Sequence, residues 1–398
     1  MEYNALAPTS RTTIFLKRAL IGLSRSRLIN SQQKRKILRN QALLTAACDK
    51  LTRTDRTAPQ GGHALVVGDF SVNNGLGRAA RYDMATFHDQ HTSITTFDLT
   101  LGRFGAGTGP RRFDATYFLC QPDRFSTIAD LIDHNWIAAS YRVGRWVWET
   151  PKFPRDWLVA EKVVHEVWTP SQFCANVFQS SLNVPVKVVP HYVTSPPTND
   201  IDMRTRFAIS RDAFMGIAIM DLRSCPPRKN LMGNVRAWRA AFGNDPSAPF
   251  IIKVRVSKRT AVELDEARLV GSDCPNIRFV TEEFSDGEIA AFQHACDVYV
   301  SLHRAEGFGL NIREALLLNK PVVATHWSAN AEYGPLFKSY LPVTFDLVPY
   351  KDWTHSYPDS DFKWAEPRIA TAARLLKDLR SNHDEVRRHG ALRNLLTE

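Results

Sequence analysis

The sequence predicts two α/β domains in tandem, preceded by a basic helical extension. Three observations support this fold class. The chain has 398 residues, more than one ordinary domain holds. Short apolar runs of strand length alternate with helical stretches in two series, and polar, turn-rich segments separate the parts. No run of the sequence reaches the ~18 consecutive apolar residues of a membrane span, and no secretory signal is recognisable, so we expect a cytoplasmic protein.

Residues 1–58 form the extension and carry most of the positive charge. They hold twelve Lys or Arg and three acids, a net charge of +9 out of +10 for the whole chain. The remaining residues are nearly neutral, which argues against nucleic acid as a partner. Within 12–30, Leu16, Ala19, Leu20 and Leu23 follow helical spacing among basic residues. This pattern fits a helix on an anionic membrane surface, reached through residues 12–56, and it fits a solvated or domain-packing helix equally well.

The first domain is expected over residues 63–195. A turn-rich linker, 57–62, precedes a strand at 63–68, a loop that contains Gly75 and Gly77, and a helix from Arg78. Strand, glycine loop and helix in this order open a Rossmann-like unit. Helical stretches between the later strands predict a parallel sheet covered on both faces. These further strands are expected at 93–99, 114–119, 141–148, 166–169 and 186–189.

The second domain is expected over residues 213–365, after a polar boundary at 194–212. Its strands are expected at 214–222, 250–256, 277–281, 297–302, 321–325 and 341–345. Residues 366–398 form a charged helical segment that we expect to pack back toward the first domain. Two such domains predict a cleft between the carboxyl ends of two parallel sheets, where ligands bind in these folds.

The most informative segment is the turn that follows residues 297–302. Gly307 and Gly309 let the backbone approach a ligand closely, and the helix that follows offers free N–H groups to an anion. Glu306 lies in the turn, and Glu314 lies eight residues later in the helix. The two carboxylates suit the hydroxyl groups of a bound sugar nucleotide. A helix cap and an exposed helix acid would give the same two residues.

Several motifs in order resemble the retaining glycosyltransferases of family 4, whose fold is called GT-B. Glu306 to Leu310 together with Glu314 look like the E-x7-E motif of that family. The resemblance covers residues 63 to about 390 and leaves the extension outside. Its other motifs are Trp146 to Pro151, Trp168 to Ser171, Val189 to His191, Arg228 to Asn230, Lys320 to Thr325, Ser328 to Glu332 and Trp364 to Pro367.

The resemblance implies roles for the residues of these motifs. Lys229, with Arg228 beside it, would bind the donor diphosphate, whose negative charge needs fixed cations. The family's usual arginine before this lysine is replaced by Ser224, and Arg223 is displaced from that position by one residue. Glu306 would contact the transferred sugar, and Glu314 would bind the ribose.

Further residues are implied with less specific motifs. The backbone of Gly307, Phe308, Gly309 and Leu310 would face the sugar and phosphates. Gly75 and Gly77 would belong to a loop that closes over the diphosphate, although a tight strand-to-helix turn also needs glycine. Glu149, His191 and His134 are cleft candidates, and for each a structural role is an equal alternative. The aromatic cluster of Trp146, Trp148 and Trp157 and the six scattered cysteines are expected to be buried, and the thiols to be reduced.

The expected function is retaining transfer of a hexosyl group, such as mannose or glucose, from a nucleotide diphosphate sugar. The acceptor would be a saccharide or a lipid-linked saccharide, as in bacterial exopolysaccharide or lipopolysaccharide synthesis. The resemblance implies that no metal or other cofactor is needed. Two alternatives stay open at this point: a nucleotide-sugar epimerase of the same architecture, and a sugar-nucleotide binding protein without catalytic activity.

Overall fold

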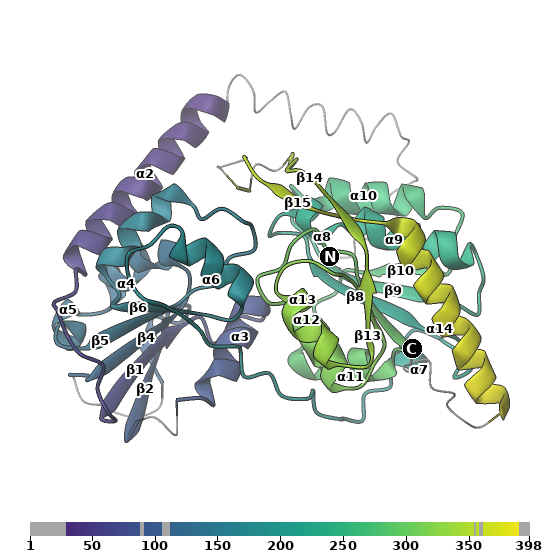
Figure 1. Ribbon diagram of the computed structural model, residues 1–398, viewed down its shortest axis with the longest axis horizontal. Coiled ribbons are helices and arrows are strands. Elements are labelled where there is room, and N and C mark those ends of the chain that lie inside the picture. Colours follow the sequence, from purple (N-terminus) through teal and green to yellow (C-terminus); the bar gives the residue numbers. More distant parts are fainter. Residues whose placement is uncertain (1–28, 88–90, 106–111, 354–355, 358–360, 390–398) are drawn as a thin grey trace. The chain divides into compact units, whose positions relative to one another are not determined.

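The computed structural model describes residues 29–87, 91–105, 112–353, 356–357 and 361–389 (Figure 1). Contacts within the described chain divide it into two compact units, with the boundary between Thr194 and Ser195. Each unit is built around its own largely parallel sheet. Among the helices of the described residues, none is long and apolar enough to cross a membrane.

The sheet of the first unit has seven strands in the order β3-β2-β1-β4-β5-β6-β7. All neighbours run parallel except the short edge strand β3, which is antiparallel to β2. The strands are β1 (His63–Gly68), β2 (Ser93–Asp98), β3 (Arg103–Phe104), β4 (Ala115–Leu119), β5 (Tyr141–Arg145), β6 (Glu166–Thr169) and β7 (Val186–Val188).

The predicted strands of this unit are confirmed to within a few residues at their ends. Four consecutive apolar residues, Ala64 to Val67, are fully buried in β1. Such a continuous apolar run belongs to a strand covered on both faces. The helices of the unit are α2 (Ile29–Lys50), α3 (Gly75–Met84), α4 (Phe125–Leu131), α5 (His134–Ile137) and α6 (Gln172–Gln179), with 3-10 turns at Pro122–Arg124 and Arg155–Lys162.

The sheet of the second unit has six parallel strands in the order β10-β9-β8-β11-β12-β13. In chain order this is 3-2-1-4-5-6, the order of a Rossmann fold, and the direction reverses between β8 and β11. Ligands bind at the carboxyl ends of the strands at such a reversal. The strands are β8 (Gly216–Asp221), β9 (Phe250–Arg255), β10 (Ile277–Val280), β11 (Val298–Ser301), β12 (Val322–Thr325) and β13 (Tyr340–Val343).

Helices cover both faces of this second sheet. One buried cluster joins the sheet to α9 (Leu231–Phe242), α10 (Ala261–Val270) and α14 (Ile369–His389). The other joins the opposite face to α11 (Asp286–Ala295) and α12 (Leu310–Leu317). The short elements α7 (Met203–Arg206), α8 (Pro226–Lys229), α13 (Asn330–Tyr333) and a 3-10 turn at Gly334–Leu336 complete the unit.

The basic extension is not a free appendage in its described part. Helix α2 contacts α4, and its own residues Leu44, Ala47 and Cys48 are buried. Lys50 Nζ donates to the carbonyl oxygen of Ala129 at 2.6 Å. Residues 29–58 therefore belong to the first unit, because the apolar side of α2 is part of its core. The predicted amphipathic helix at 12–30 lies outside the described residues, apart from its last two positions.

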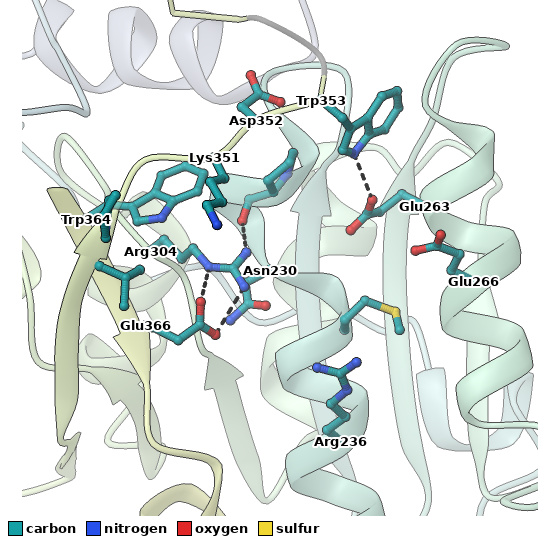
Figure 2. A pocket seen from close by; sticks show the side chains of 14 residues that line it. Asn230, Arg236, Glu263, Glu266, Arg304, Lys351, Asp352, Trp353, Trp364 and Glu366 are labelled. Atoms are coloured by element: carbon teal, nitrogen blue, oxygen red, sulfur yellow. Dashed lines mark hydrogen bonds and ion pairs between the residues drawn. The ribbon is translucent and has the colours of Figure 1, made fainter. Parts of the chain in front are cut away.

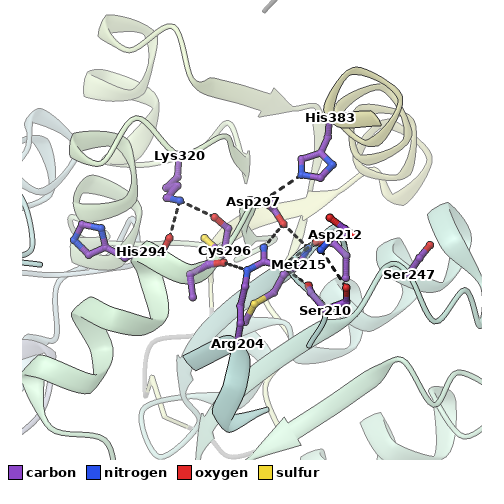
Figure 3. A network of polar contacts seen from close by, with 12 residues as sticks. Arg204, Ser210, Asp212, Met215, Ser247, His294, Cys296, Asp297, Lys320 and His383 are labelled. Carbon is purple, nitrogen blue, oxygen red and sulfur yellow. Dashed lines mark hydrogen bonds and ion pairs between the residues drawn. The ribbon is translucent and has the colours of Figure 1, made fainter. Parts of the chain in front are cut away.

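The described part of the C-terminal helix packs on the second unit, and the expected packing of this segment back toward the first domain stays a prediction. Helix α14 lies against α9. Arg380 Nη1 donates to the carbonyl oxygen of Ser247 at 2.7 Å, and His383 Nε2 lies 3.5 Å from Asp297 Oδ1. Asp297 also accepts from Arg204 Nη2 at 2.6 Å, so one carboxylate ties the C-terminal helix to α7 (Figure 3). The apolar face of α14 is buried against α9.

A two-stranded antiparallel hairpin was not predicted from the sequence. It consists of β14 (Phe345–Pro349) and β15 (Lys363–Pro367). The sequence analysis recognised Trp364 to Pro367 only as a motif. In the structure, Ala365 N donates to the carbonyl oxygen of Arg304 at 3.1 Å, so the hairpin is fastened to the turn that follows β11.

Candidate functional site

Two strand-to-helix turns meet at the carboxyl edge of the second sheet. One joins β8 to α8, which carries Arg228 and Lys229, and the other joins β11 to α12 and carries Glu306. Because β8 and β11 are neighbours in the sheet, the two turns lie side by side. Arg304 N donates to the carbonyl oxygen of Arg228 at 2.8 Å, which links the turns directly.

A cluster of three charged side chains connects these turns. Lys229 Nζ forms a hydrogen-bonded ion pair with Glu306 Oε1. Arg228 Nη1 lies 3.3 Å from the same oxygen and donates to the carbonyl oxygen of Ala305 at 3.0 Å. Burial opposes ionisation of Glu306, but the charges of Lys229 and Arg228 outweigh it and lower its pKa from 4.5 to about 2. The Glu306 carboxylate is therefore ionised at neutral pH.

The backbone on both sides of α8 is constrained to aim this helix. Cys225 and Asn230, which flank it, have φ values of 76° and 52°, in the left-handed region. The Asn230 side chain offsets part of the cost of this backbone conformation. It donates to the carbonyl oxygen of Leu302 at 2.7 Å and accepts from Gly233 N at 3.1 Å. Residues in such conformations persist where the surrounding contacts fix them, and they concentrate at functional sites.

Hydrogen bonds with two side chains from the segment after β12 fix the turn from Glu306 to Leu310. Glu306 N donates to Ser328 Oγ at 2.9 Å, and Tyr333 Oη donates to the carbonyl oxygen of Phe308 at 2.7 Å. Gly309 has a φ of 83° and precedes the first residue of α12. A side chain at Gly309 would be strained at this φ and would lie 3.2 Å from Tyr333 Oη. The turn therefore needs glycine there, and α12 begins with backbone N–H groups suited to an anion.

Glu314 lies in α12 and is buried, with 1% of its surface exposed. Its carboxylate accepts a hydrogen bond from Gln293 Nε2 of α11 at 3.0 Å. It is not the exposed helix acid that formed the alternative explanation. Its assignment to a ribose stays a prediction, and its neighbour Gln293 was not among the residues predicted from the sequence.

His303 was missed by the sequence analysis. It lies between β11 and Glu306 and is 1% exposed, with Asn330 as a polar neighbour. Neither ring nitrogen makes a hydrogen bond of normal geometry to the residues that the structure describes. Burial, together with the charge of Lys229, lowers its pKa from 6.5 to about 4 despite the opposing charge of Glu306. The signal in the sequence that could have identified His303 is its position three residues before Glu306 of the motif.

The buried His303 makes stability depend on pH. The unfolded chain binds a proton near pH 6.5 that the folded protein takes up only near pH 4, so stability is lost as the pH falls through this window. We expect the free energy of unfolding to fall by roughly 2 kcal/mol between pH 7 and pH 5 from this group. Urea unfolding at both pH values should show this loss in the wild type and not in His303→Leu. The matched control is His134→Leu, which replaces an exposed histidine. If His303→Leu loses as much stability between pH 7 and pH 5 as the wild type, His303 is not the source of the pH dependence.

Arg223 is not part of the cluster. Its guanidinium forms a two-point ion pair with Asp221, with Nε 2.9 Å from Oδ1 and Nη2 2.6 Å from Oδ2. Ser224 accepts a hydrogen bond from Arg228 Nη2 at 3.3 Å. Of the three basic candidates, the structure brings Lys229 and Arg228 to Glu306.

The remaining candidates lie in the first unit. Gly77 lies in the first turn of α3, where a Cβ atom would lie 2.1 Å from the carbonyl oxygen of Val72, so this turn needs glycine for steric reasons. Gly75 has open space around its Cα atom. His134 is an exposed residue at the start of α5, 3.8 Å from Asp133. Glu149 follows β5 and is partly buried.

His191 belongs to a buried network that the sequence did not reveal. His191 Nδ1 lies 2.8 Å from Asp83 Oδ2, and Arg145 Nε donates to the same oxygen at 2.8 Å. Burial lowers the pKa of His191, and the network lowers that of Asp83 from 3.8 to about 2 against its burial. These contacts join α3, β5 and the segment after β7, which favours the structural role of His191.

Trp146, Trp148 and the cysteines are buried as expected, whereas Trp157 is partly buried. Trp146 is fully buried, and Trp148 packs against Trp157 with ring centroids 5.1 Å apart. These rings therefore serve the core of the first unit. All six cysteines are buried and free.

Comparisons with known proteins show a similarity of fold. No protein-family model and no curated protein matches the sequence. HepE of Anabaena, solved in complex with UDP-glucose, has a TM-score of 0.52 and 14% sequence identity, covering 81% of this chain and 94% of HepE. A glycosyltransferase from Rickettsia africae ESF-5 has a TM-score of 0.52 and 11% identity, covering 82% of this chain and 94% of that protein.

These similarities, with the two strand orders, confirm the predicted pair of Rossmann-like domains of a GT-B glycosyltransferase fold. HepE in complex with UDP and glucose gives the same result, with a TM-score of 0.51, 15% identity, and 68% of this chain and 82% of HepE covered. At such low identity the similarity concerns the fold alone. The predicted arrangement of the two domains across a cleft stays a prediction.

Proposed function

We propose that this protein is a retaining glycosyltransferase of family 4 that transfers a hexosyl group from a nucleotide diphosphate sugar to a saccharide acceptor. The observation that carries the proposal is the cluster of Lys229, Arg228 and Glu306 at the carboxyl edge of a Rossmann sheet. Two fixed cations beside one carboxylate suit a ligand with a diphosphate and a sugar, because the cations neutralise the leaving group and the carboxylate orients hydroxyls.

In the proposed order of binding, the donor replaces the ion pair between Lys229 and Glu306. Without ligand, Lys229 contacts Glu306. A diphosphate would compete for the Lys229 ammonium group, and Glu306 would then accept hydrogen bonds from the hexose. Arg228 keeps its contact with the Ala305 carbonyl and holds the Glu306 turn in place. Glu314 would bind the ribose, and the backbone from Gly307 to Leu310 would face the sugar and phosphates.

The chemical step would consist mainly of positioning and charge stabilisation. In the family, the leaving phosphate oxygen is thought to accept the acceptor's proton while the acceptor attacks from the same face. We propose that no metal is needed, because Lys229 and Arg228 supply the positive charge. Excess EDTA should then leave the initial rate unchanged.

A panel of nucleotide sugars tests the donor. HepE was solved with UDP-glucose, so UDP-hexoses are the first candidates and GDP-mannose is the next. A donor at 100 times its dissociation constant should raise the free energy of unfolding by about 2.7 kcal/mol, which a thermal shift detects. Slow release of the nucleoside diphosphate in the presence of that donor should accompany the shift. A panel without any shift or hydrolysis would overturn the proposal.

Two experiments separate the alternatives. An epimerase would convert the donor to a second nucleotide sugar without any acceptor, which product analysis by NMR would reveal. A purely binding protein would show the thermal shift without hydrolysis or transfer. Retention is tested by the anomeric configuration of the transferred sugar, because an inverted product excludes family 4.

We further propose that the acceptor is lipid-linked and that residues 1–28 help the protein to reach an anionic membrane surface. Only these residues should be deleted in the test, because residues 29–58 carry α2 and its contacts with the first unit. We expect the truncated protein to fold but to sediment several-fold less with vesicles of phosphatidylglycerol and phosphatidylcholine. Vesicles of phosphatidylcholine alone are the control. Equal sedimentation of both proteins would exclude the membrane role.

A further inference from the structure

A cavity of about 940 Å³ lies beside the charged cluster, within the second unit (Figure 2). Pro227 and Asn230 line it, whereas Lys229, between them in sequence, contacts Glu306. The cavity and the cluster therefore share one turn but lie on different sides of it. The other walls come from α9, α10 and the hairpin β14–β15 with the segment that follows β14.

The wall nearest to the cluster is held by a two-point ion pair. Arg304 Nε lies 2.6 Å from Glu366 Oε2, and Arg304 Nη2 lies 3.1 Å from Glu366 Oε1. The Arg304 guanidinium also donates to the carbonyl oxygen of Pro227 and lies 5.5 Å from the ring centroid of Trp364. These contacts join α8, the turn after β11 and β15, so this side of the cavity is formed before any ligand arrives.

The opposite wall carries an aromatic ring. Trp353 Nε1 donates to Glu263 Oε2 of α10 at 3.3 Å, and Figure 2 shows the indole at the rim of the cavity. Met232 and Val348 add apolar surface. An indole fixed by its N–H group presents a flat apolar face, which suits the C–H groups of a sugar ring.

The charges of the lining argue against a strongly charged ligand. Four acids and three basic residues face the cavity: Glu263, Glu266, Asp352, Glu366, Arg236, Arg304 and Lys351. Arg236 and Lys351 make no hydrogen bond or ion pair with the described residues, so they can donate to a ligand. A mixture of donors and acceptors around apolar surface suits a neutral molecule with many hydroxyl groups.

We propose that this cavity binds a neutral oligosaccharide, namely the part of an acceptor glycan that extends away from the reacting hydroxyl. The inference rests on the proposed function, which requires a saccharide acceptor next to the donor. It places part of that acceptor on the second unit, in addition to the acceptor domain expected at 63–195. The volume lies within the range of ligand pockets, so several sugar rings can enter.

Saturation-transfer NMR with three neutral trisaccharides tests the inference. Maltotriose, mannotriose and triacetylchitotriose are the probes, each at millimolar concentration. We expect saturation transfer to at least one of them, a loss of most of the signal in Trp353→Ala and Arg236→Ala, and an unchanged signal in Lys229→Ala. Two matched controls should also keep the signal. Leu347→Ala changes an exposed residue of the hairpin β14–β15. Arg239→Ala changes a residue of α9 that pairs with Asp273 outside the cavity.

The outcomes separate the two proposals. No saturation transfer to any of the three trisaccharides overturns the cavity assignment, and so does a signal that survives both Trp353→Ala and Arg236→Ala. Thermal unfolding of each variant shows whether it is folded, and a misfolded variant is replaced by Trp353→Phe or Arg236→Gln. UDP-glucose binding and hydrolysis are measured separately, so a failure there counts against the donor site and leaves the NMR result to decide the cavity.

Discussion

Replacement of Lys229 by alanine is expected to lower kcat with a nucleotide sugar donor by about 10²- to 10³-fold, the usual loss when one preorganised charge is removed from a developing anion. Lys229 is the cation that contacts Glu306 and has part of its surface open to a ligand. Its removal also leaves Arg228 as the remaining cation of the cluster, and the buried Arg228 guanidinium is committed to the Ala305 carbonyl. Initial rates of nucleoside diphosphate release measure the effect.

One further variant tests whether the positive charge at position 229 is what catalysis needs, and a second is a control for the loss of any lysine. Lys229→Arg keeps the charge and should retain more activity than Lys229→Ala. Lys338→Ala removes an exposed lysine of the same unit and should behave as the wild type. A rate for Lys229→Ala within threefold of the wild type would show that the cluster does not hold the donor diphosphate.

Replacement of Asp83 by asparagine is expected to give the largest loss of stability. Asp83 and Arg145 are 3% and 4% exposed, and asparagine would leave the Arg145 charge buried without its carboxylate. Breaking such a pair costs about 3–5 kcal/mol, which in a unit of this size lowers the melting temperature by on the order of 10 °C. Urea unfolding followed by circular dichroism measures the loss.

The matched control is Asp49→Asn, which breaks an exposed ion pair with Lys162 in the same unit. Such pairs contribute about 0–1 kcal/mol, so the control should unfold close to the wild type. Because the pKa of Asp83 is lowered to about 2, its contribution is present above pH 3.8 and is lost as the pH falls toward 2. Equal destabilisation by the two replacements would contradict the role of the buried network.

Local patterns in the sequence were enough to predict the architecture. The strands predicted at 63–68 and 166–169 match β1 and β6, and the other predicted strands differ mainly at their ends. A buried parallel strand needs a continuous apolar run, and a strand-to-helix turn needs glycine at particular positions, as at Gly309. Both requirements concern neighbouring residues, so they are visible without a structure.

The charge-rich extension shows where local patterns fail. Twelve basic residues in 1–58 suggested a separate arm. Yet Leu44, Ala47 and Cys48 bury one side of α2 in the first unit. Net charge describes the solvent-exposed surface, whereas a few apolar positions decide whether a helix packs.

The sequence by itself determined the two Rossmann-like domains, the turn with Glu306 and the helix with Glu314. Only the tertiary structure decided which charged groups meet: Lys229 and Glu306 are 77 residues apart, and Asp83 and His191 are 108 apart. Strand order sets the first pairing, because β8 and β11 become neighbours only when the sheet forms. The second pairing forms only when α3 and the segment after β7 come together in the folded first unit. The cavity that Trp353 lines and the burial of His303 likewise depend on contacts between distant segments. Such contacts cannot be predicted from the spacing of residues along the chain.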